Sequence, residues 1–288
     1  MPFSFVDKGT GRAELETLVE LGRSHDQLIL VHQMGKVGSR TVIQSLRRHF
    51  RRSQKDIPIF HSHFLNGDRL QHQLKRYETS DMPLKAHLVH AQALRCLIDQ
   101  HQALETKTWK LITLVRDPIA RNVSGFFQNI RSFFPQALYA ETEPSYTQKE
   151  IEEVFLNRYG HSLPLTWLDE EITSVFGIDP YGSPFPWQQG YQIYRENRVE
   201  LLLIRLENLT PDTAQQAFKE LLGLEGLELK QKNVGDRKHY SDAYKRFQAQ
   251  VQLPQSYLDR MYDSRYAQQF YSPAERQQFR QRWNITAS

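Results

Sequence analysis

The sequence contains a single cysteine, Cys96, in 288 residues. One thiol excludes an internal disulfide framework and any zinc site built from several cysteines, and we expect Cys96 to be a small buried apolar residue. No apolar run approaches the roughly 18–20 residues that a membrane-spanning helix needs, so no integral membrane segment is predicted. The N-terminus also lacks a basic segment followed by an apolar one, and we therefore expect a cytoplasmic protein without a signal peptide.

No stretch rich in proline, glycine and serine divides the chain, so we expect residues 1–288 to form a single domain with a sizeable core. A large excess of charge of one sign is also absent, since 37 Lys and Arg against 33 Asp and Glu give a formal net charge of +4. This balance suits anionic ligands but is too small to predict nucleic-acid binding. The one dense basic cluster is either a solvated helix face or a contact for a polyanionic acceptor, and it consists of Arg47, Arg48, Arg51 and Arg52.

The Walker A order GxxxxGK[ST] is missing from residues 28–41, the stretch around which the chain is organised. Residues 28–31 have the length and branching of a buried parallel strand, and apolar residues recur at helical spacing after the stretch. Gly35 and Gly38 permit a tight turn between strand and helix, which predicts a cradle of backbone N–H groups for a phosphate. Lys36 precedes Gly38, so the usual Gly-Lys-Ser/Thr magnesium site is absent. A plain tight turn without a ligand is the alternative.

Strands and helices alternate after this loop, which predicts an α/β fold with a parallel sheet covered by helices on both faces. Further strands are predicted at residues 57–65, 84–90, 111–115 and 199–204, the last paired with 191–194. His61, His63 and His90 fall at the ends of two of these strands. Ligands of such sheets bind at the carboxyl ends of the strands, so these histidines are candidate site residues.

The unit that begins at residue 111 carries a second candidate site. Asp117 is a natural N-cap and is followed by a proline at the first helical position, so a helix starts directly after the strand. Its apolar stripe leaves Arg121 and Ser124 on another face. Arg116 at the strand end and Ser124 two turns later form a suitable pair for a phosphate, whereas an ion pair of Arg116 with a carboxylate is the alternative.

Together these segments resemble the sulfotransferases that use 3′-phosphoadenosine 5′-phosphosulfate as donor. That superfamily has a lysine-before-glycine loop for the 5′-phosphosulfate, and an arginine at a strand end followed eight residues later by a serine for the 3′-phosphate. Arg116 and Ser124 have this spacing. The loop residues that would bind the donor are Gly35, Lys36, Val37, Gly38, Ser39, Arg40 and Thr41, of which Arg40 replaces a residue that is often small. The resemblance implies a P-loop-like parallel sheet, and sulfuryl transfer that needs no metal.

Residues 31–46 and 115–129 are also similar to bacterial sulfotransferase-like proteins associated with capsular polysaccharide synthesis. Residues 232–241 resemble the Asn-Lys-Trp-Tyr-Ser region of that family, with His239 in place of the tryptophan. In many sulfotransferases a basic segment near the C-terminus closes over the nucleotide. The resemblance therefore implies a carbohydrate hydroxyl as acceptor, and it adds Lys232, Arg237 and Lys238 to the candidate donor ligands.

Residues 135–198 interrupt the alternation of strands and helices, and we expect this helical and aromatic insertion to cover the acceptor site. Three aromatic residues of this segment would either stack on sugar rings or fill a small core: Tyr181, Phe185 and Trp187. Lys36 is expected to neutralise charge on the leaving phosphate. A histidine is expected to accept the proton of the acceptor hydroxyl, with His90 favoured over His63. The rival functions are a P-loop kinase that binds ATP and a non-catalytic module that binds polyanions.

Overall fold

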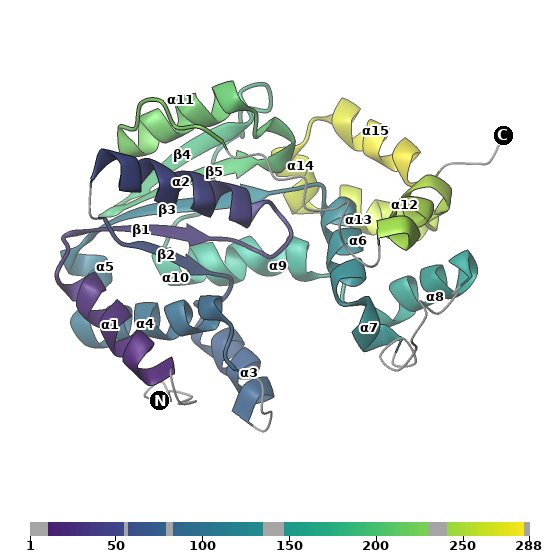
Figure 1. Ribbon diagram of the computed structural model, residues 1–288. Coiled ribbons are helices and arrows are strands. Elements are labelled where there is room, and N and C mark those ends of the chain that lie inside the picture. Colours follow the sequence, from purple (N-terminus) through teal and green to yellow (C-terminus); the bar gives the residue numbers. More distant parts are fainter. Residues whose placement is uncertain (1–10, 55–56, 79–82, 135–146, 230–240, 285–288) are drawn as a thin grey trace. The chain divides into compact units, whose positions relative to one another are not determined.

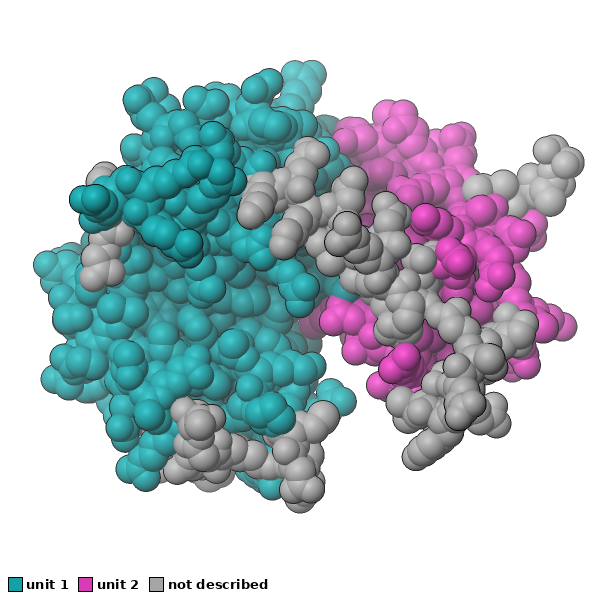
Figure 2. Space-filling model, viewed as in Figure 1, with its two compact units in different colours: residues 1–115, 167–230 teal, residues 116–166, 231–288 magenta. Residues whose placement is uncertain are grey.

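The chain forms two compact units in the computed structural model (Figure 2), which describes residues 11–54, 57–78, 83–134, 147–229 and 241–284. Unit 1 consists of Met1–Val115 and Trp167–Lys230, and unit 2 consists of Arg116–Thr166 and Gln231–Ser288. This division into compact units does not test the expectation of a single domain, which stays a prediction. The expected insertion contributes residues to both units, and its residues 135–146 lie outside the described part of the chain.

Unit 1 is built on a five-stranded sheet with the order β2-β1-β3-β5-β4 (Figure 1). Its strands are β1 (Gln27–His32), β2 (Ile59–Ser62), β3 (Thr108–Val115), β4 (Tyr191–Glu196) and β5 (Val199–Arg205). All neighbouring pairs are parallel except β4 and β5, so the predicted α/β class is confirmed. The chain moves from β1 to β2 on one side and later to β3 on the other. The carboxyl end of β1 is therefore a topological switch point, where open α/β sheets bind their ligands.

Helices cover both faces of this sheet: α2 and α11 lie on one face, and α1 and α4 lie on the other (Figure 1). The central strands between them are mainly apolar, and the four residues 28–31 of β1 are all fully buried. The helical elements of unit 1 are α1 (Gly11–Arg23), α2 (Ser39–Ser53), α3 (Gly67–Glu78), α4 (Ala86–His101), α5 (Ala103–Thr106), the π-helical turn η2 (Asp169–Thr173), α10 (Ser174–Phe176), the 3₁₀ turn η3 (Leu206–Asn208) and α11 (Pro211–Leu222). Helix α9 (Leu163–Leu168) contains the boundary between the units.

The strand predicted at residues 84–90 is wrong, because this segment opens α4. Residues 88–94 of the helix are all buried, so the apolar residues show no clear helical stripe at this end. A short buried apolar run fits a strand and a buried helix equally well, and only the alanines and glutamine that follow favour a helix. His90 consequently lies in the second turn of α4 and not at the end of a strand.

Short-range interactions set the ends of several elements. Helix α8 (Gln148–Arg158) begins with a complete capping box between Thr147 and Glu150. The helical stretch of α9, η2 and α10 ends at Gly177, which has the positive φ of 73° that ends a helix. The predicted pairing of strands β4 and β5 is confirmed, and the two strands are antiparallel.

Unit 2 is helical, and aromatic rings from several of its helices form its core. Its helices are α6 (Pro118–Gln128), α7 (Ile130–Phe133), α8, α12 (Ser241–Gln250), α13 (Gln255–Tyr262), α14 (Arg265–Phe270) and α15 (Pro273–Arg282). Phe126 packs edge-to-face against Phe127 and Phe155, with ring centroids 5.3 and 5.4 Å apart. Residues 255–282 are divided among the three consecutive helices α13, α14 and α15.

Two expectations, a buried Cys96 and the lack of a membrane-spanning helix, can be compared with the structure. Cys96 is half-buried rather than buried, and its thiol donates a hydrogen bond to Gln100 Oε1 over 3.2 Å, because the outer side of α4 faces solvent at this point. In the described part of the chain, no helix has the length and apolar character required to cross a bilayer.

Candidate functional site

The loop between β1 and α2 contains two residues in the left-handed conformation. Lys36 and Gly38 adopt positive φ angles of 77° and 96°. A Cβ atom on Gly38 would be strained in this conformation and would lie 2.8 Å from Leu206 Cδ1, so that side chain would have to move. Lys36 adopts the left-handed conformation although it is not glycine, and residues strained in this way cluster at active sites and ligand sites. The loop conformation is therefore compatible with the predicted phosphate cradle.

The start of α2 offers hydrogen-bond donors to an anion. Gly38 is the N-cap and supplies no side-chain acceptor, and the first turn contains no acidic residue. The first N–H groups of a helix have no partner within the helix, and they lie at the positive end of its dipole. The side chains of Ser39 and Thr41 are half-buried beside them, Val37 is buried, and Arg40 is exposed. This arrangement fits a phosphate or sulfate group.

His63 lies directly after β2 and is held next to this loop. Its ring Nδ1 is 2.6 Å from the backbone oxygen of Gln33, the first residue after β1. A carbonyl oxygen can only accept a hydrogen bond, so Nδ1 carries the proton and donates it. In the neutral ring the other nitrogen, Nε2, then has the lone pair. His63 can thus accept a proton at Nε2 while its ring stays fixed to the residue that leads into the cradle.

His90 has the opposite hydrogen-bonding arrangement. The backbone N–H of His61 donates to His90 Nδ1 over 3.3 Å, so Nδ1 has the lone pair and Nε2 carries the proton in the neutral ring. The ring is 8% exposed. Burial, followed by the positive charge of Arg47, lowers the pKa of His90 to about 4. His90 is therefore a neutral buried histidine whose available lone pair is already used by the backbone.

His61, His63 and His87 form a cluster of rings at the end of β2. The His63 ring centroid is 4.7 Å from that of His61 and 4.7 Å from that of His87. Burial lowers the pKa of His61 to about 2 and that of His87 to about 3, with further lowering by the neighbouring histidines. Sequence reasoning missed His87 because it was placed inside a predicted strand. Among the described residues no group of three or more His, Cys, Asp or Glu side chains has the geometry to hold a metal ion.

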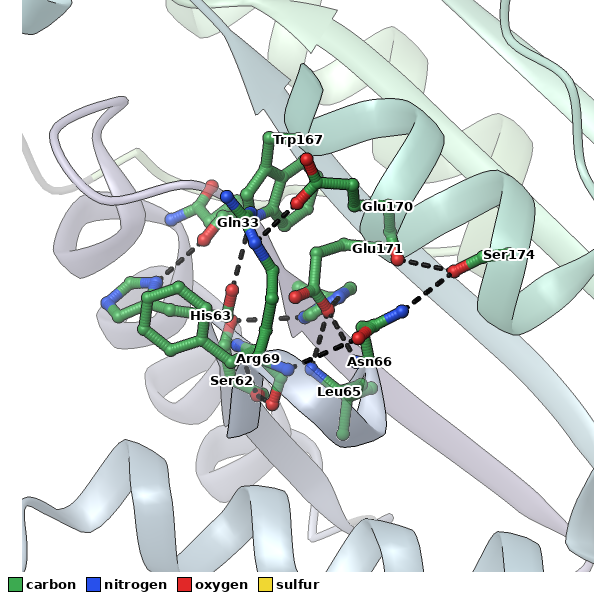
Figure 3. A network of polar contacts seen from close by, with 12 residues as sticks. Gln33, Ser62, His63, Leu65, Asn66, Arg69, Trp167, Glu170, Glu171 and Ser174 are labelled. Atoms are coloured by element: carbon green, nitrogen blue, oxygen red, sulfur yellow. Dashed lines mark hydrogen bonds and ion pairs between the residues drawn. The ribbon is translucent and has the colours of Figure 1, made fainter. Parts of the chain in front are cut away.

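A buried polar network supports the segment that carries His63 (Figure 3). Trp167 Nε1 donates to the backbone oxygen of His63 over 3.0 Å. Glu171 Oε2 accepts hydrogen bonds from the backbone N–H groups of Leu65 and Asn66, over 2.5 and 2.9 Å. Glu171 was also missed from the sequence, since nothing in its local pattern distinguishes an inward glutamate from the solvated Glu170 beside it.

In unit 2, Arg116 lies just before the start of α6, and Ser124 lies within that helix. Asp117 caps this helix as predicted by accepting from the N–H of Ile119 over 2.9 Å. The backbone N–H of Arg116 donates to the hydroxyl of Tyr266 over 3.0 Å. Ser124 and the side chain of Arg116 are half-buried. Arg116 therefore has a fixed backbone at the point where the chain enters unit 2.

Arg121 lies off the apolar stripe of α6 but is buried. Its side chain is 6% exposed, and its guanidinium donates to Tyr159 and to Asn122 Oδ1, over 3.1 and 3.0 Å. Tyr159 directly follows α8 and Asn122 belongs to α6 itself, so oxygen atoms from two segments compensate for burial of the charge. The periodicity of α6 carries no sign of this burial, because it depends on the hydroxyl of Tyr159 from another segment.

Other predicted site residues take ordinary positions or lie outside the described part of the chain. The arginines at the end of α2 are exposed, and Arg48 and Arg52 form ion pairs with Glu228, at 3.8 and 3.3 Å. Of the aromatic residues, Phe185 is buried and Trp187 is 37% exposed. Tyr181 is half-buried. Lys232, Arg237 and Lys238 lie outside the described residues.

A family model supplies an independent comparison. Residues 145–272 match the family described as "Putative capsular polysaccharide synthesis protein" (NKWYS). The similarity agrees with the resemblance to capsular polysaccharide synthesis proteins that the sequence suggested. Searches of curated proteins and of solved structures find no match to the chain.

The match to capsular polysaccharide synthesis proteins covers less than half of the chain, and it includes only some of the candidate site residues. It includes Trp167 and Glu171, which contact the segment after β2. It does not include the Lys36 loop, His63 or Arg116. The family similarity and the anion cradle are thus separate observations from different parts of the sequence.

Proposed function

We propose that the protein is a sulfotransferase that moves the sulfuryl group of 3′-phosphoadenosine 5′-phosphosulfate to a hydroxyl of a carbohydrate. The observation that carries the proposal is the pairing of two features at the end of the sheet: the cradle at Lys36 and Gly38, and His63 bound to Gln33 with Nε2 as its basic nitrogen. An anion site beside a fixed general base suits transfer of an anionic group to a hydroxyl. The lysine-before-glycine order supports a sulfotransferase over a magnesium-dependent kinase.

In the proposed reaction the acceptor oxygen attacks the sulfur, and the bond between sulfur and the bridging phosphate oxygen breaks. The hydroxyl proton passes to Nε2 of His63. Lys36 and the N–H groups at the start of α2 neutralise the charge that develops on the departing phosphate. By analogy with phosphoryl transfer, such a loose transition state depends on positioning and charge neutralisation rather than on covalent catalysis.

His63 replaces His90 as the favoured base in this proposal. His90 was favoured because it was expected at a strand end, and that premise does not hold. Its Nδ1 accepts from the backbone of His61, whereas His63 uses Nδ1 as a donor and keeps the basic lone pair on Nε2. The hydrogen-bond directions therefore favour His63 over His90 for the proton-accepting role.

Arg116 and Ser124 are proposed to bind the 3′-phosphate of the donor. Support comes from their spacing and from the fixed backbone of Arg116, and a guanidinium suits a phosphate because it presents several donors in one plane. The carbohydrate acceptor is supported by the similarity to capsular polysaccharide synthesis proteins. Lys232, Arg237 and Lys238 remain proposed donor ligands from the sequence resemblance alone.

The experiment has a binding part and a turnover part. Calorimetry compares adenosine 3′,5′-bisphosphate with ATP, and the first is expected to bind at least about tenfold more tightly, equivalent to about 1.4 kcal/mol. Transfer of labelled sulfate from the donor to a panel of capsular oligosaccharides tests the activity. Preference for ATP would favour the kinase, and nucleotide binding without transfer to any acceptor would favour a binding module.

Variants then test the base. His63→Ala is expected to lower turnover by about 10²- to 10⁴-fold and to remove the acidic limb of the pH–rate profile, with donor affinity nearly unchanged. His90→Asn is the matched control, because its Oδ1 can still accept from the backbone N–H of His61. A loss of the acidic limb in His90→Asn, with the limb retained in His63→Ala, would return the role to His90.

A further inference from the structure

The π-helical turn η2 has no role in the reaction proposed above, yet it contacts the segment that carries His63. Single π-helical turns are rare, and they often occur at functional sites because the wider turn re-aims side chains. Here the turn follows Trp167 and contains Glu170 and Glu171. Glu170 forms an ion pair with Arg69 and is 37% exposed, whereas Glu171 is fully buried. Two adjacent glutamates thus lie in opposite environments.

Glu171 binds the backbone after β2 rather than a surface cation. One carboxylate oxygen, Oε2, accepts from the N–H groups of Leu65 and Asn66, which start the loop between β2 and α3 (Figure 3). The same oxygen lies 3.3 Å from Nε2 of His32, a fully buried residue at the end of β1. A buried carboxylate is unfavourable unless such partners compensate for its lost hydration. The partners here all belong to the two strand ends that flank His63.

His63 is consequently held from two directions. On its backbone, the indole of Trp167 donates to its carbonyl oxygen, and Glu171 accepts from the N–H groups two and three residues further along, those of Leu65 and Asn66. On its ring, Nδ1 donates to the backbone oxygen of Gln33. A shift of the backbone at His63 would carry the ring away from Gln33, and the contacts from Trp167 and Glu171 oppose this shift.

We infer that Glu171 is a positioning residue, which holds the β2–α3 loop so that Nε2 of His63 is presented as the base. The role of His63 as the base rests on the proposed function, whereas the statement that Glu171 holds the β2–α3 loop does not. A π-helical turn adds a residue to the turn, so it changes which side chains share a face before and after it. In this turn Glu171 contacts the loop, whereas Glu170 pairs with Arg69.

The test uses Glu171→Ala, with Glu170→Ala as the matched control from the same turn. Glu171→Ala is expected to lower kcat by about 10- to 100-fold with KM for the donor changed less than about twofold, because positioning errors affect the reacting geometry more than binding. Glu171→Gln is expected to retain most of kcat, since its amide oxygen can accept the same two N–H groups. Glu170→Ala is expected to leave kcat within about twofold of the unchanged protein.

A spectroscopic measurement separates positioning from general loss of structure. Nitrogen-15 NMR of the histidine rings in the full chain reports which nitrogen is protonated, and the His63 signal is assigned by its absence in His63→Ala. We expect a protonated Nδ1 for His63 in the unchanged protein and in Glu171→Gln, and averaging between the two neutral forms in Glu171→Ala. If Glu171→Ala does not fold, Glu171→Asp replaces it, because the shorter carboxylate should also lower kcat and average the signal.

The outcomes distinguish this inference from the proposed function. A folded Glu171→Ala or Glu171→Asp protein with unchanged kcat and a protonated Nδ1 on His63 would overturn the positioning role. An equal loss of kcat in Glu170→Ala would do the same. If the unchanged protein transfers no sulfuryl group, the proposed function fails, and the ring signals alone still decide whether Glu171 holds His63.

Discussion

Replacement of His90 by asparagine should make unit 1 less sensitive to acid. His90 is 8% exposed, and its Nδ1 accepts from the backbone N–H of His61. Asn Oδ1 can take over this acceptor role but cannot be protonated in the acid range. The replacement therefore removes one titrating group while preserving its main hydrogen bond.

The magnitude follows from the pKa of His90, which burial and the charge of Arg47 lower from 6.5 to about 4. The unfolded chain binds this proton below about pH 6.5, whereas the folded protein excludes it until about pH 4. The contribution of His90 to stability is thus complete above pH 6.5 and is lost as the pH falls toward 4. Between about pH 7.5 and about pH 5 the loss is about 2 kcal/mol for this one group.

Urea unfolding followed by tryptophan fluorescence at about pH 7.5 and about pH 5 measures the effect. The unchanged protein should lose about 2 kcal/mol more unfolding free energy between these pH values than His90→Asn does. His72→Asn is the control, because His72 is exposed on α3 and its replacement should leave the pH dependence unaltered. Equal pH dependence in the unchanged protein and in His90→Asn would refute the assignment of His90 as a buried neutral histidine.

Three further predictions concern the proposed donor site. Lys36→Ala should lower turnover far more than donor affinity, since its contact strengthens as charge develops on the phosphate, and a large loss of binding with normal turnover of the bound enzyme would contradict this role. Arg116→Ala and Ser124→Ala should each weaken adenosine 3′,5′-bisphosphate by about 10- to 100-fold in calorimetry and adenosine 5′-phosphate much less, and equal weakening would remove the assignment. Gly38→Ala should cost about 1–3 kcal/mol in thermal unfolding and abolish nucleotide binding, because φ is 96° and its Cβ would contact Leu206 at 2.8 Å; unchanged binding would show that the loop adapts.

The parts of the fold that could be predicted from the sequence are those that local interactions determine. The loop after β1 was recognisable because glycine at residue 38 is required by the backbone, and Asp117 was recognisable as a cap because its side chain bonds an N–H two residues away. The pairing of β4 with β5 followed from two apolar runs separated by a short polar turn. In each case the cause lies within a few residues of its effect.

The parts that were missed depend on partners far away in the chain. Residues 88–94 are all buried by other elements, so the helical period of the segment that begins with the predicted strand is hidden. Arg121 is buried because Tyr159 offers it a hydroxyl, 38 residues later. Glu171 is buried because Leu65 and Asn66 point N–H groups at it from 106 and 105 residues away. No window of local sequence contains these partners, so patterning and propensity could not reveal them.

The interleaving of the two units along the chain affects how the protein can be synthesised and dissected. Strand β3 ends at Val115, but β5, which pairs with its other edge, begins only at Val199. During translation, more than eighty further residues are therefore synthesised while one apolar edge of the nascent sheet is unpaired. Such edges are prone to intermolecular pairing. A fragment that stops at Val115 would keep that edge open permanently, so truncation there should yield an aggregating product rather than an independently folded module.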